Sequence, residues 1–432
     1  MKKVLIITYY WPPGGGSGVQ RWLKFVKYLP QTGWQPIVYT PENGEMPVND
    51  ASLTDDIPAD TEVLKTKIWE PYNLYKTFIG ADKNVKVSTG FLTEEKKPGM
   101  AEKLSVWLRG NIFIPDARRF WIGPSIKYLS SYLEKSQVDA IVSTGPPHSM
   151  HLIAMKLSEK FNIPWMADFR DPWTKIDYFG ELMLTQLAEK KHYQLEREVI
   201  TRATRVVVVG NTMKKEFEQE YKRHVDVITN GYDSDDVKAH TIPSTGKFSI
   251  AHVGTLVRSQ NPVVLWNTLS EMARKDAAFK NDLEIRLTGK VDLEIRNSLK
   301  EAGLISNVTF IDYMPHNQVI SEQQRAMLLL LVLKNSPQSM GILTGKLFEY
   351  LAAKRPILCV GPVEGDAAVV INETKSGTTV DFDNQKAMNQ VMADFYSKFK
   401  TGNLTVNVGD VQKYSRKALT VTLANLLNEI SH

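Results

Sequence analysis

The strongest constraint on the fold is an alternation of short apolar runs with longer amphipathic segments, which occurs in each half of the chain. The apolar runs are continuous, as expected for strands covered on both faces. Such strand–helix repetition predicts an α/β protein with parallel, doubly wound sheets. The expected strands are residues 3–8, 36–40, 138–144, 164–168, 205–209 and 225–229, then 248–252, 284–288, 309–311, 328–333, 356–360 and 378–382.

These strands are too many for one ordinary open sheet, so we expect two domains. A chain of 432 residues also favours two domains. The stretch 233–247 is polar, lacks a clear period and contains Pro and Gly, which is typical of a linker. We therefore place the first domain at 1–235 and the second at 245–408, with a last helix near 411–430.

Composition excludes several classes of protein. The 53 Lys and Arg exceed the 48 Asp and Glu by five, which permits attraction to nucleotides or lipid phosphates. A nucleic-acid partner is not expected, because no dense basic stripe is present. No apolar run reaches the roughly 18 residues of a membrane span. The single Cys359 excludes a disulfide framework and suits a reducing compartment, so we expect a cytoplasmic protein.

The stretch 69–121 shows no steady strand or helix period but is rich in aromatic and basic residues, including Trp107 and Trp121. Two interpretations remain open. The rings pack inside the first domain, or they form an amphipathic surface that touches an anionic membrane or a lipid-linked acceptor.

Three polar segments of the first half follow expected strands. Gly15 and Gly16 lie in a glycine-rich loop before a helix, where backbone N–H groups can approach a phosphate. His148 opens another helix and can bond a sugar hydroxyl or move a proton. Asp168 and Arg170 end a strand as a charged cluster that is either self-paired or part of a site. Ligands bind at such strand ends in open α/β sheets.

The second half contains a similar arrangement. Gly254 follows its first strand and permits close approach, and Arg258 offers a guanidinium for phosphate. Thr344-Gly345-Lys346 opens a later helix with free N–H groups and a cation. Glu349 is one turn further on, where a carboxylate can accept from two ribose hydroxyls. Together these residues predict a site for a nucleoside diphosphate.

No metal site is expected. Asp233-Ser234-Asp235 spells a metal-binding pattern of some sugar-transfer enzymes, but it follows Asn230-Gly231 in a stretch typical of a turn.

Six blocks of the sequence together resemble the retaining glycosyltransferases of family 4, which have the GT-B architecture. They are Pro-Pro-Gly-Gly-Gly at 12–16, Gly-Pro-Pro-His at 145–148, Ala-Asp-Phe-Arg-Asp-Pro-Trp at 167–173, Asn-Gly-Tyr-Asp at 230–233, Val-Gly-Thr at 253–255 and Gly-Lys-Leu-Phe-Glu-Tyr-Leu at 345–351. The resemblance implies two Rossmann-like domains facing across a cleft. It also implies that a C-terminal helix, 411–432, crosses back to complete the first domain.

The resemblance further implies transfer of a sugar from a nucleotide sugar to a glycan or lipid-linked acceptor, with retention and without a cofactor or an obligatory metal. Such a reaction fits bacterial surface polysaccharide or glycolipid biosynthesis. Arg258, Lys346 and the helix terminus would stabilise the leaving diphosphate, while His148, Asp168 and Arg170 would orient donor sugar and acceptor.

The sequence departs from the family at three positions. Gly341 stands where the family often has Glu, and Thr255 and Gln260 replace an Arg and a Lys. Arg258 and Lys346 are expected to compensate. Three alternatives stay open: a nucleotide-sugar 2-epimerase, a non-catalytic nucleotide or glycan binder, and a dehydrogenase that uses Glu42.

Overall fold

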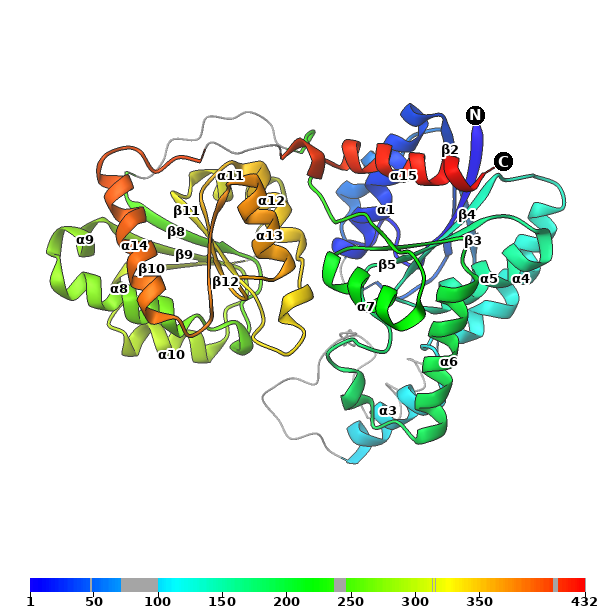
Figure 1. Cartoon of the computed structure of the whole chain (residues 1–432), viewed down its shortest axis with the longest axis horizontal. Helices are drawn as coiled ribbons and strands as arrows, with labels where there is room; N and C mark the ends of the chain where they lie inside the picture. Colours follow the sequence, from blue (N-terminus) through cyan, green and yellow to red (C-terminus); the bar gives the residue numbers. More distant parts are fainter. Residues whose placement is uncertain are drawn as a thin grey trace. The chain divides into compact units, whose positions relative to one another are not determined.

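The computed structural model describes residues 1–46, 49–70, 100–236, 246–312, 314, 316–406 and 411–431. The chain forms two compact units, shown in Figure 1. One comprises Met1–Thr229 with Arg416–His432, and the other comprises Asn230–Ser415. Among the described residues, no helix is long and apolar enough to cross a membrane.

The first unit contains a seven-stranded parallel sheet in the order β3-β2-β1-β4-β5-β6-β7. Its strands are β1 Lys2–Ile7, β2 Trp34–Pro41, β3 Glu62–Thr66, β4 Ala140–Gly145, β5 Trp165–Phe169, β6 Arg205–Val208 and β7 Asp226–Val227. Its described helices are α1 Ser17–Tyr28, α3 Met100–Asn111, α4 Arg119–Leu133, α5 Ser149–Phe161, α6 Gln186–Arg202, α7 Asn211–Tyr221 and α15 Arg416–Ile430, with short 3-10 turns η1 Leu29–Thr32, η2 Ala51–Asp56 and η3 Phe179–Leu182.

The second unit contains a six-stranded parallel sheet in the order β10-β9-β8-β11-β12-β13. Its strands are β8 Phe248–Val253, β9 Leu283–Thr288, β10 Val308–Ile311, β11 Leu328–Val332, β12 Ile357–Val360 and β13 Gly377–Val380. Its described helices are α8 Val263–Lys275, α9 Ala277–Asp282, α10 Leu293–Glu301, α11 His316–Arg325, α12 Gly345–Ala353, α13 Asp366–Thr374 and α14 Gln385–Lys400, with 3-10 turns η4 Arg258–Gln260, η5 Ile305–Asn307, η6 Ser339–Gly341 and η7 Gln412–Tyr414.

Both sheets confirm the predicted doubly wound α/β class. Successive residues of β1 show why its apolar run is continuous: Leu5 and Ile7 pack into one core cluster, and Val4 and Ile6 pack into the cluster on the other face. Helix α15 contributes Leu423 and other apolar residues to the second of these clusters. The C-terminal helix therefore completes the core of the first unit, as expected.

Some expected elements differ from the structure. Strand β3 was not predicted, because it lies at the sheet edge and its residues are only half buried. Helix α4 escaped prediction because Pro124 lies inside it, where proline is normally unfavourable. The last helix begins at Arg416 rather than near 411, since the turn η7 precedes it.

The aromatic stretch 69–121 is divided between core and surface. Trp121 is buried, stacks on Tyr39 with ring centroids 4.8 Å apart and donates to Thr66 Oγ1, so for this ring the core interpretation is confirmed. Trp69 is 55% exposed and packs edge-on against Phe120. Tyr72, Tyr75, Lys76, Phe78 and residues 96–99 lie outside the described residues.

A buried ion pair joins three elements of the first unit. Arg21 of α1 meets Asp168 of β5, with Nη2 2.8 Å from Oδ1 and both side chains about 1% exposed. The same guanidinium donates to the carbonyls of Ile228 and Thr229, which follow β7. Trp22 Nε1 and Thr144 Oγ1 donate to Asp168 Oδ2. Burial alone would raise the pKa of Asp168, but the charge of Arg21 and these hydrogen bonds hold it below its ordinary value.

We predict that Asp168→Asn strongly destabilises the first unit, because Arg21 would keep a buried charge without a counter-charge. Breaking one partner of a buried ion pair costs about 3–5 kcal/mol. The measurement is the urea midpoint followed by fluorescence. Glu134→Gln, which removes an exposed ion pair with Lys160, is the control and should cost less than about 1 kcal/mol. Equal midpoints for Asp168→Asn and wild type would contradict the assignment.

Candidate active site

Several polar side chains of the second unit lie together between the end of β8 and the start of α12. Lys346 Nζ is 3.4 Å from His252 Nε2 and 3.3 Å from the carbonyl oxygen of Thr255. It makes no ion pair among the described residues. Burial lowers the pKa of Lys346 from its ordinary value of 10.5, and the nearby Glu349 carboxylate opposes that shift. A cation therefore lies at a strand end without a carboxylate that neutralises it directly.

His252 is held in one tautomer. Its Nδ1 is 2.9 Å from the carbonyl oxygen of Leu330, which can only accept, so Nδ1 carries the proton. Nε2 is then a lone-pair acceptor directed at the Lys346 ammonium. Burial, followed by the charge of Lys346, lowers the pKa of His252 to about 3, so the imidazole is neutral at physiological pH.

Gly254 leaves the space through which the lysine side chain reaches this position. A Cβ built on Gly254 would lie 2.6 Å from Cε and 2.9 Å from Nζ of Lys346. Gly254 also has φ +115°, in the region that favours glycine. Tyr350, one turn after Lys346, fixes the same strand end by accepting from Val253 N at 3.1 Å.

Helix α12 also places Glu349 and its own amino terminus at this edge. Glu349 Oε2 accepts from Gln323 Nε2 at 3.2 Å, and Oε1 has no hydrogen bond within the described part of the chain. Thr344 occupies the N-cap position without a side-chain cap. The hydroxyl oxygens of Thr344 and Ser336 are buried and lack partners among the described residues. Several donors and acceptors are thus available where the strand order reverses between β8 and β11.

Arg258 lies apart from this constellation. Its Nε is 2.5 Å from Glu294 Oε2, and its side chain is 63% exposed. No contact between Arg258 and Lys346 is found among the described residues. Gln260, at a position where the family often has a cation, donates to the carbonyl of Val332 at 2.9 Å. The structure therefore brings together Gly254, Thr344, Gly345, Lys346 and Glu349, but not Arg258.

In the first unit, the predicted residues surround the ends of β1, β4 and β5. Gly15 and Gly16 lie in the loop before α1, and Gly16 has φ +96° at the N-cap of that helix. Arg170 Nε donates to the carbonyl of Gly145 at 3.3 Å, and its Nη2 donates to that of Pro146. A Cβ on Gly18 would lie 2.5 Å from Arg170 Nη1, so the first turn of α1 and the guanidinium are in close contact.

Asp168 and Arg170 were predicted as one cluster, but their side chains have different partners. Asp168 is engaged by Arg21, Trp22 and Thr144 inside the unit. Arg170 instead lies over the ring of Tyr10, 5.6 Å from its centroid. The two charged side chains therefore do not form one cluster.

His148 is buried and stacks on Trp173, with ring centroids 4.6 Å apart. Burial, with a further contribution from His151, lowers its pKa well below the ordinary value, so it is neutral. Its Nδ1 has no hydrogen-bond partner within the described residues. A Cβ on Gly145 would lie 2.5 Å from His151 Nε2 and 2.9 Å from His148 Nδ1, so glycine makes room for both rings.

The Asp233 carboxylate accepts a hydrogen bond from the backbone of its own turn. Asp233 Oδ1 accepts from Asp235 N at 3.1 Å, as the sequence predicted for a turn. No group of three or more potential metal ligands occurs among the described residues.

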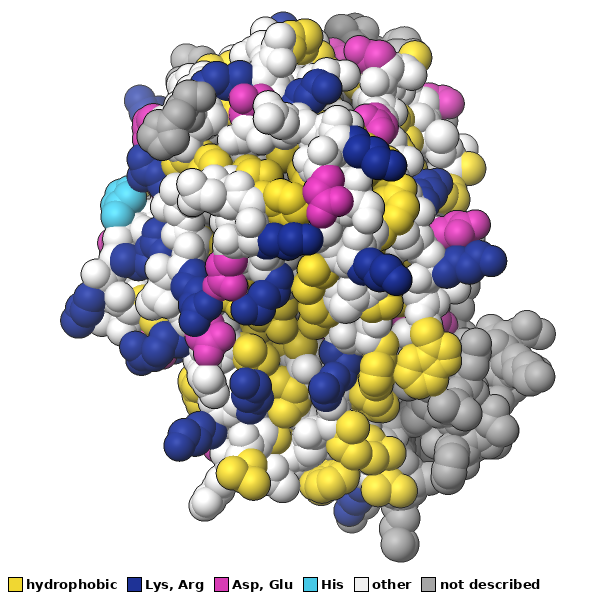
Figure 2. Space-filling model, turned by 90° about the vertical axis from the view of Figure 1, so that its right-hand side faces the viewer, with side chains coloured by type: hydrophobic (Ala, Val, Ile, Leu, Met, Phe, Trp, Pro, Cys, Tyr) yellow, Lys and Arg dark blue, Asp and Glu magenta, His cyan; other side chains and the backbone are white. Residues whose placement is uncertain are grey.

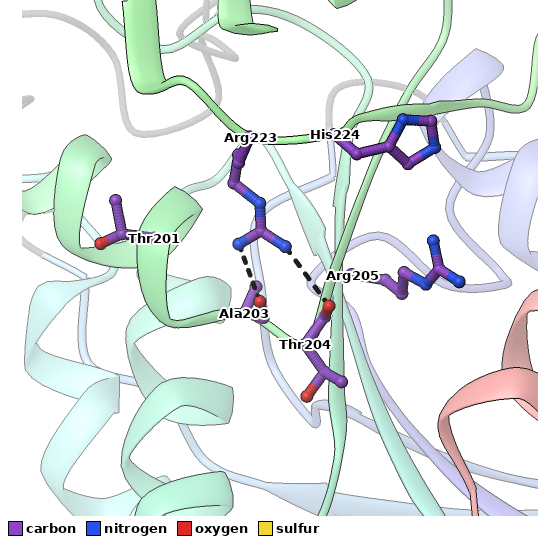
Figure 3. A pocket seen from close by; sticks show the side chains of 6 residues that line it. All are labelled: Thr201, Ala203, Thr204, Arg205, Arg223 and His224. Atoms are coloured by element: carbon purple, nitrogen blue, oxygen red, sulfur yellow. Dashed lines mark hydrogen bonds between the residues drawn. The ribbon is translucent and has the colours of Figure 1, made fainter.

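A hollow of about 410 Å³ lies near the start of β6 and is lined by Thr201, Ala203, Thr204, Arg205, Arg223 and His224 (Figure 3). The Arg223 guanidinium donates to the carbonyls of Ala203 and Thr204. Arg205 pairs with Asp226 and Glu429. These cations are committed to the protein itself, and this edge is opposite to the strand ends where ligands bind.

Sequence reasoning missed His252 and Arg21. His252 was visible as the residue before Val253-Gly254, but nothing local distinguishes a buried strand histidine from a functional one. Arg21 reads as an ordinary charge of an amphipathic helix, since its partner is 147 residues away.

We predict that the His252 imidazole keeps its Nδ1–H tautomer and does not titrate between about pH 5 and 8. With its folded pKa below the unfolded value, its contribution to stability is complete above about pH 6.5 and is lost as pH falls toward about 3. NMR of isotope-labelled histidine side chains measures this, with His252→Asn providing the assignment. A titration midpoint near pH 6 would contradict the arrangement with Lys346.

The sequence matches two protein-family models. Residues 16–236, just over half of the chain, match the family model "Glycosyltransferase Family 4", and residues 233–403 match "Glycosyl transferases group 1". No curated protein matches the sequence.

Three similar solved structures show the same fold at low identity. Anabaena HepE in complex with UDP-glucose is 11% identical, with a TM-score of 0.59 over 99% of this chain and 100% of that one. A variant of S. aureus TarM in complex with fondaparinux, α-GlcNAc-glycerol and UDP is 13% identical, with a TM-score of 0.54 over 99% and 100%. A putative UDP-N-acetylglucosamine 2-epimerase from Listeria monocytogenes is 10% identical, with a TM-score of 0.54 over 97% and 94%. With a family model covering more than half of its length, the chain belongs to glycosyltransferase family 4.

Proposed function

We propose that this glycosyltransferase transfers a sugar, with retention, from a nucleotide sugar bound by the second unit to a glycan or lipid-linked acceptor bound by the first. The observation that carries the proposal is the unpaired Lys346, held by His252 beside the amino terminus of α12. Glu349 follows on the same helix, within one turn of the cation. Binding of UDP-glucose by HepE, which has the same fold, supports a nucleotide-sugar donor.

The chemistry follows from where charge develops. As the bond between the sugar C1 and the diphosphate oxygen breaks, negative charge grows on the leaving group, and Lys346 with the free N–H groups of α12 stabilises it. The acceptor hydroxyl forms the new bond to C1 on the same face, and its proton passes to the leaving phosphate. No protein nucleophile is required. Glu349 accepts from the ribose hydroxyls, and Arg258 acts from its exposed position once it leaves Glu294.

In the first unit, His148 and Arg170 orient the reacting sugars, and Gly15 and Gly16 allow close approach of a phosphate to the α1 terminus. Asp168 acts through the ion pair with Arg21 and is therefore a positioning residue. The lipid-linked form of the acceptor, with peripheral contact to an anionic membrane, remains part of the proposal. In the cell, this reaction would contribute to the synthesis of bacterial surface polysaccharides or glycolipids.

A nucleotide-sugar 2-epimerase is the alternative with the same fold. Incubation with a UDP-sugar alone separates the two activities. An epimerase converts the sugar to its 2-epimer, whereas a transferase needs an acceptor for turnover. NMR of the product also reports the anomeric configuration, so an inverted linkage would contradict retention.

We predict that Gly254→Ala weakens nucleoside diphosphate binding at least about tenfold, because its Cβ displaces the Lys346 ammonium and charge-assisted hydrogen bonds contribute about 1.5–3 kcal/mol. Gly303→Ala is the matched control. Gly303 also has a positive φ, +71°, but a Cβ there meets no atom within 4 Å. Isothermal titration with UDP, GDP, ADP and TDP measures the effect. Equal losses in both variants would show that backbone strain, and not Lys346, is responsible.

A further inference from the structure

The first unit contains a cavity of about 130 Å³, and none of its lining residues belongs to the nucleotide-binding cluster proposed in the second unit. Tyr10, Pro146, His148, Trp173, Tyr178 and Arg109 are among the residues that line it. They come from the loops after β1, β4 and β5 and from the end of α3. The first-unit sheet reverses its strand order between β1 and β4, so this cavity lies at the topological switch point where open α/β sheets bind ligands.

Three polar groups of this cavity have no hydrogen-bond partner within the described residues; His148 is the buried one, and Arg109 is exposed. His148 is 7% exposed, and its Nδ1 is buried without a hydrogen bond. Arg109 makes neither an ion pair nor a hydrogen bond within the described residues. Burial raises the pKa of Tyr178 to about 12 although the charge of Arg109 opposes it, so the phenol is a neutral donor. Buried polar groups are normally hydrogen-bonded, so the unpartnered His148 Nδ1, beside the exposed Arg109 and the Tyr178 phenol, indicates a polar ligand.

The acidic group of the cavity is already occupied. Asp116 Oδ1 accepts from Ser149 Oγ and from Arg118 N, and its Oδ2 accepts from Ser149 N at the start of α5. Arg118 is paired with Glu70 at 3.0 Å. Arg109 is consequently the charge in this lining that remains for a ligand, and the ligand group that suits it is an anion.

The end of α3 is fixed in a way that holds Arg109 at the cavity. A Cβ on Gly110 would lie 2.7 Å from the carbonyl oxygen of Leu182, so helix and η3 are in direct contact. Asn111 bridges the backbone of the next segment, donating to Met183 O at 3.1 Å and accepting from Thr185 N at 2.7 Å. His192 Nε2 lies 3.3 Å from Gly110 O. These contacts fix the backbone next to Arg109, from which its guanidinium extends.

We propose that this cavity binds a phosphate or diphosphate group of the acceptor, with Arg109 as its counter-ion and with His148 and Tyr178 as hydrogen-bonding partners. The acceptor role rests on the proposed glycosyl transfer, whereas the anion site itself does not. A glycan phosphate and a lipid-linked diphosphate share this chemistry.

The surface near the cavity is compatible with a lipid-linked source. Leu104 of α3, Ile112, Met183 and Leu187 of α6 are between 45% and 83% exposed. Figure 2 shows apolar side chains gathered among Lys and Arg in the lower part of the face that it draws, at the level where Figure 1 places α3. A prenyl chain leaving the cavity would find apolar surface on these elements.

The test follows the labelled imidazole signals of His148 and His252 by NMR, because each reports on one unit. Inorganic pyrophosphate should shift the His148 signal, and Arg109→Gln should weaken this response at least about tenfold. Lys103→Gln, which removes an exposed charge from the same helix, is the matched control and should leave it unchanged. His148→Asn provides the assignment, and thermal unfolding verifies that Arg109→Gln is folded.

Geranyl diphosphate is the second probe. Tighter binding than pyrophosphate at His148 identifies a lipid-linked source, and equal binding identifies a soluble phosphate, both in agreement with an anion site. An unshifted His148 signal at high millimolar pyrophosphate, or an unchanged response in Arg109→Gln, would overturn the proposal. Failure of the nucleoside diphosphates to shift His252 would instead count against the proposed donor site, so the two failures are distinguishable.

Discussion

The first unit depends on a buried ion pair between a helix and the end of a strand. Asp168 is buried near the end of β5, where an unpaired carboxylate would be costly. Arg21 supplies the counter-charge and also accounts for two carbonyl oxygens after β7. Helix α1 is thereby fixed against the sheet, and the glycine loop before it is fixed with it. The Arg21–Asp168 ion pair therefore helps to set the position of α1 and its glycine loop at this edge of the sheet.

The buried or partly buried charges of the two units have different partners. In the first unit, the Asp168 carboxylate and the Arg21 guanidinium neutralise each other. In the second unit, Lys346 rests on a neutral imidazole and a carbonyl, so its charge is positioned without being neutralised. Because no carboxylate competes for it directly, the Lys346 ammonium can bind an anionic ligand reversibly. This contrast is the physical basis for assigning phosphate chemistry to the second unit.

Much of the fold could be predicted from the sequence, because buried parallel strands leave continuous apolar runs. The edge strand β3 could not, since a half-buried strand leaves no such run, and helix α4 is interrupted by Pro124.

For the candidate site, local pattern identified Gly254, Lys346 and Glu349 because they lie within short blocks beside strand ends. It grouped Asp168 with Arg170 because they are two residues apart, but β5 ends at Phe169, so the alternation of strand side chains does not extend to Arg170. It also counted Arg258 as a free cation, although Glu294 on α10 pairs with it. Partners distant in sequence, such as Arg21, become visible only in three dimensions.

We infer that α12 and His252 together form the binding site of the donor nucleotide. It is tested most directly by a crystal structure with whichever of UDP, GDP, ADP and TDP binds tightest. The account predicts diphosphate oxygens within hydrogen-bond distance of Lys346 Nζ and ribose hydroxyls on Glu349, with the His252–Lys346 contact retained. A nucleotide bound instead at the glycine loop of the first unit, with Lys346 untouched, would contradict it.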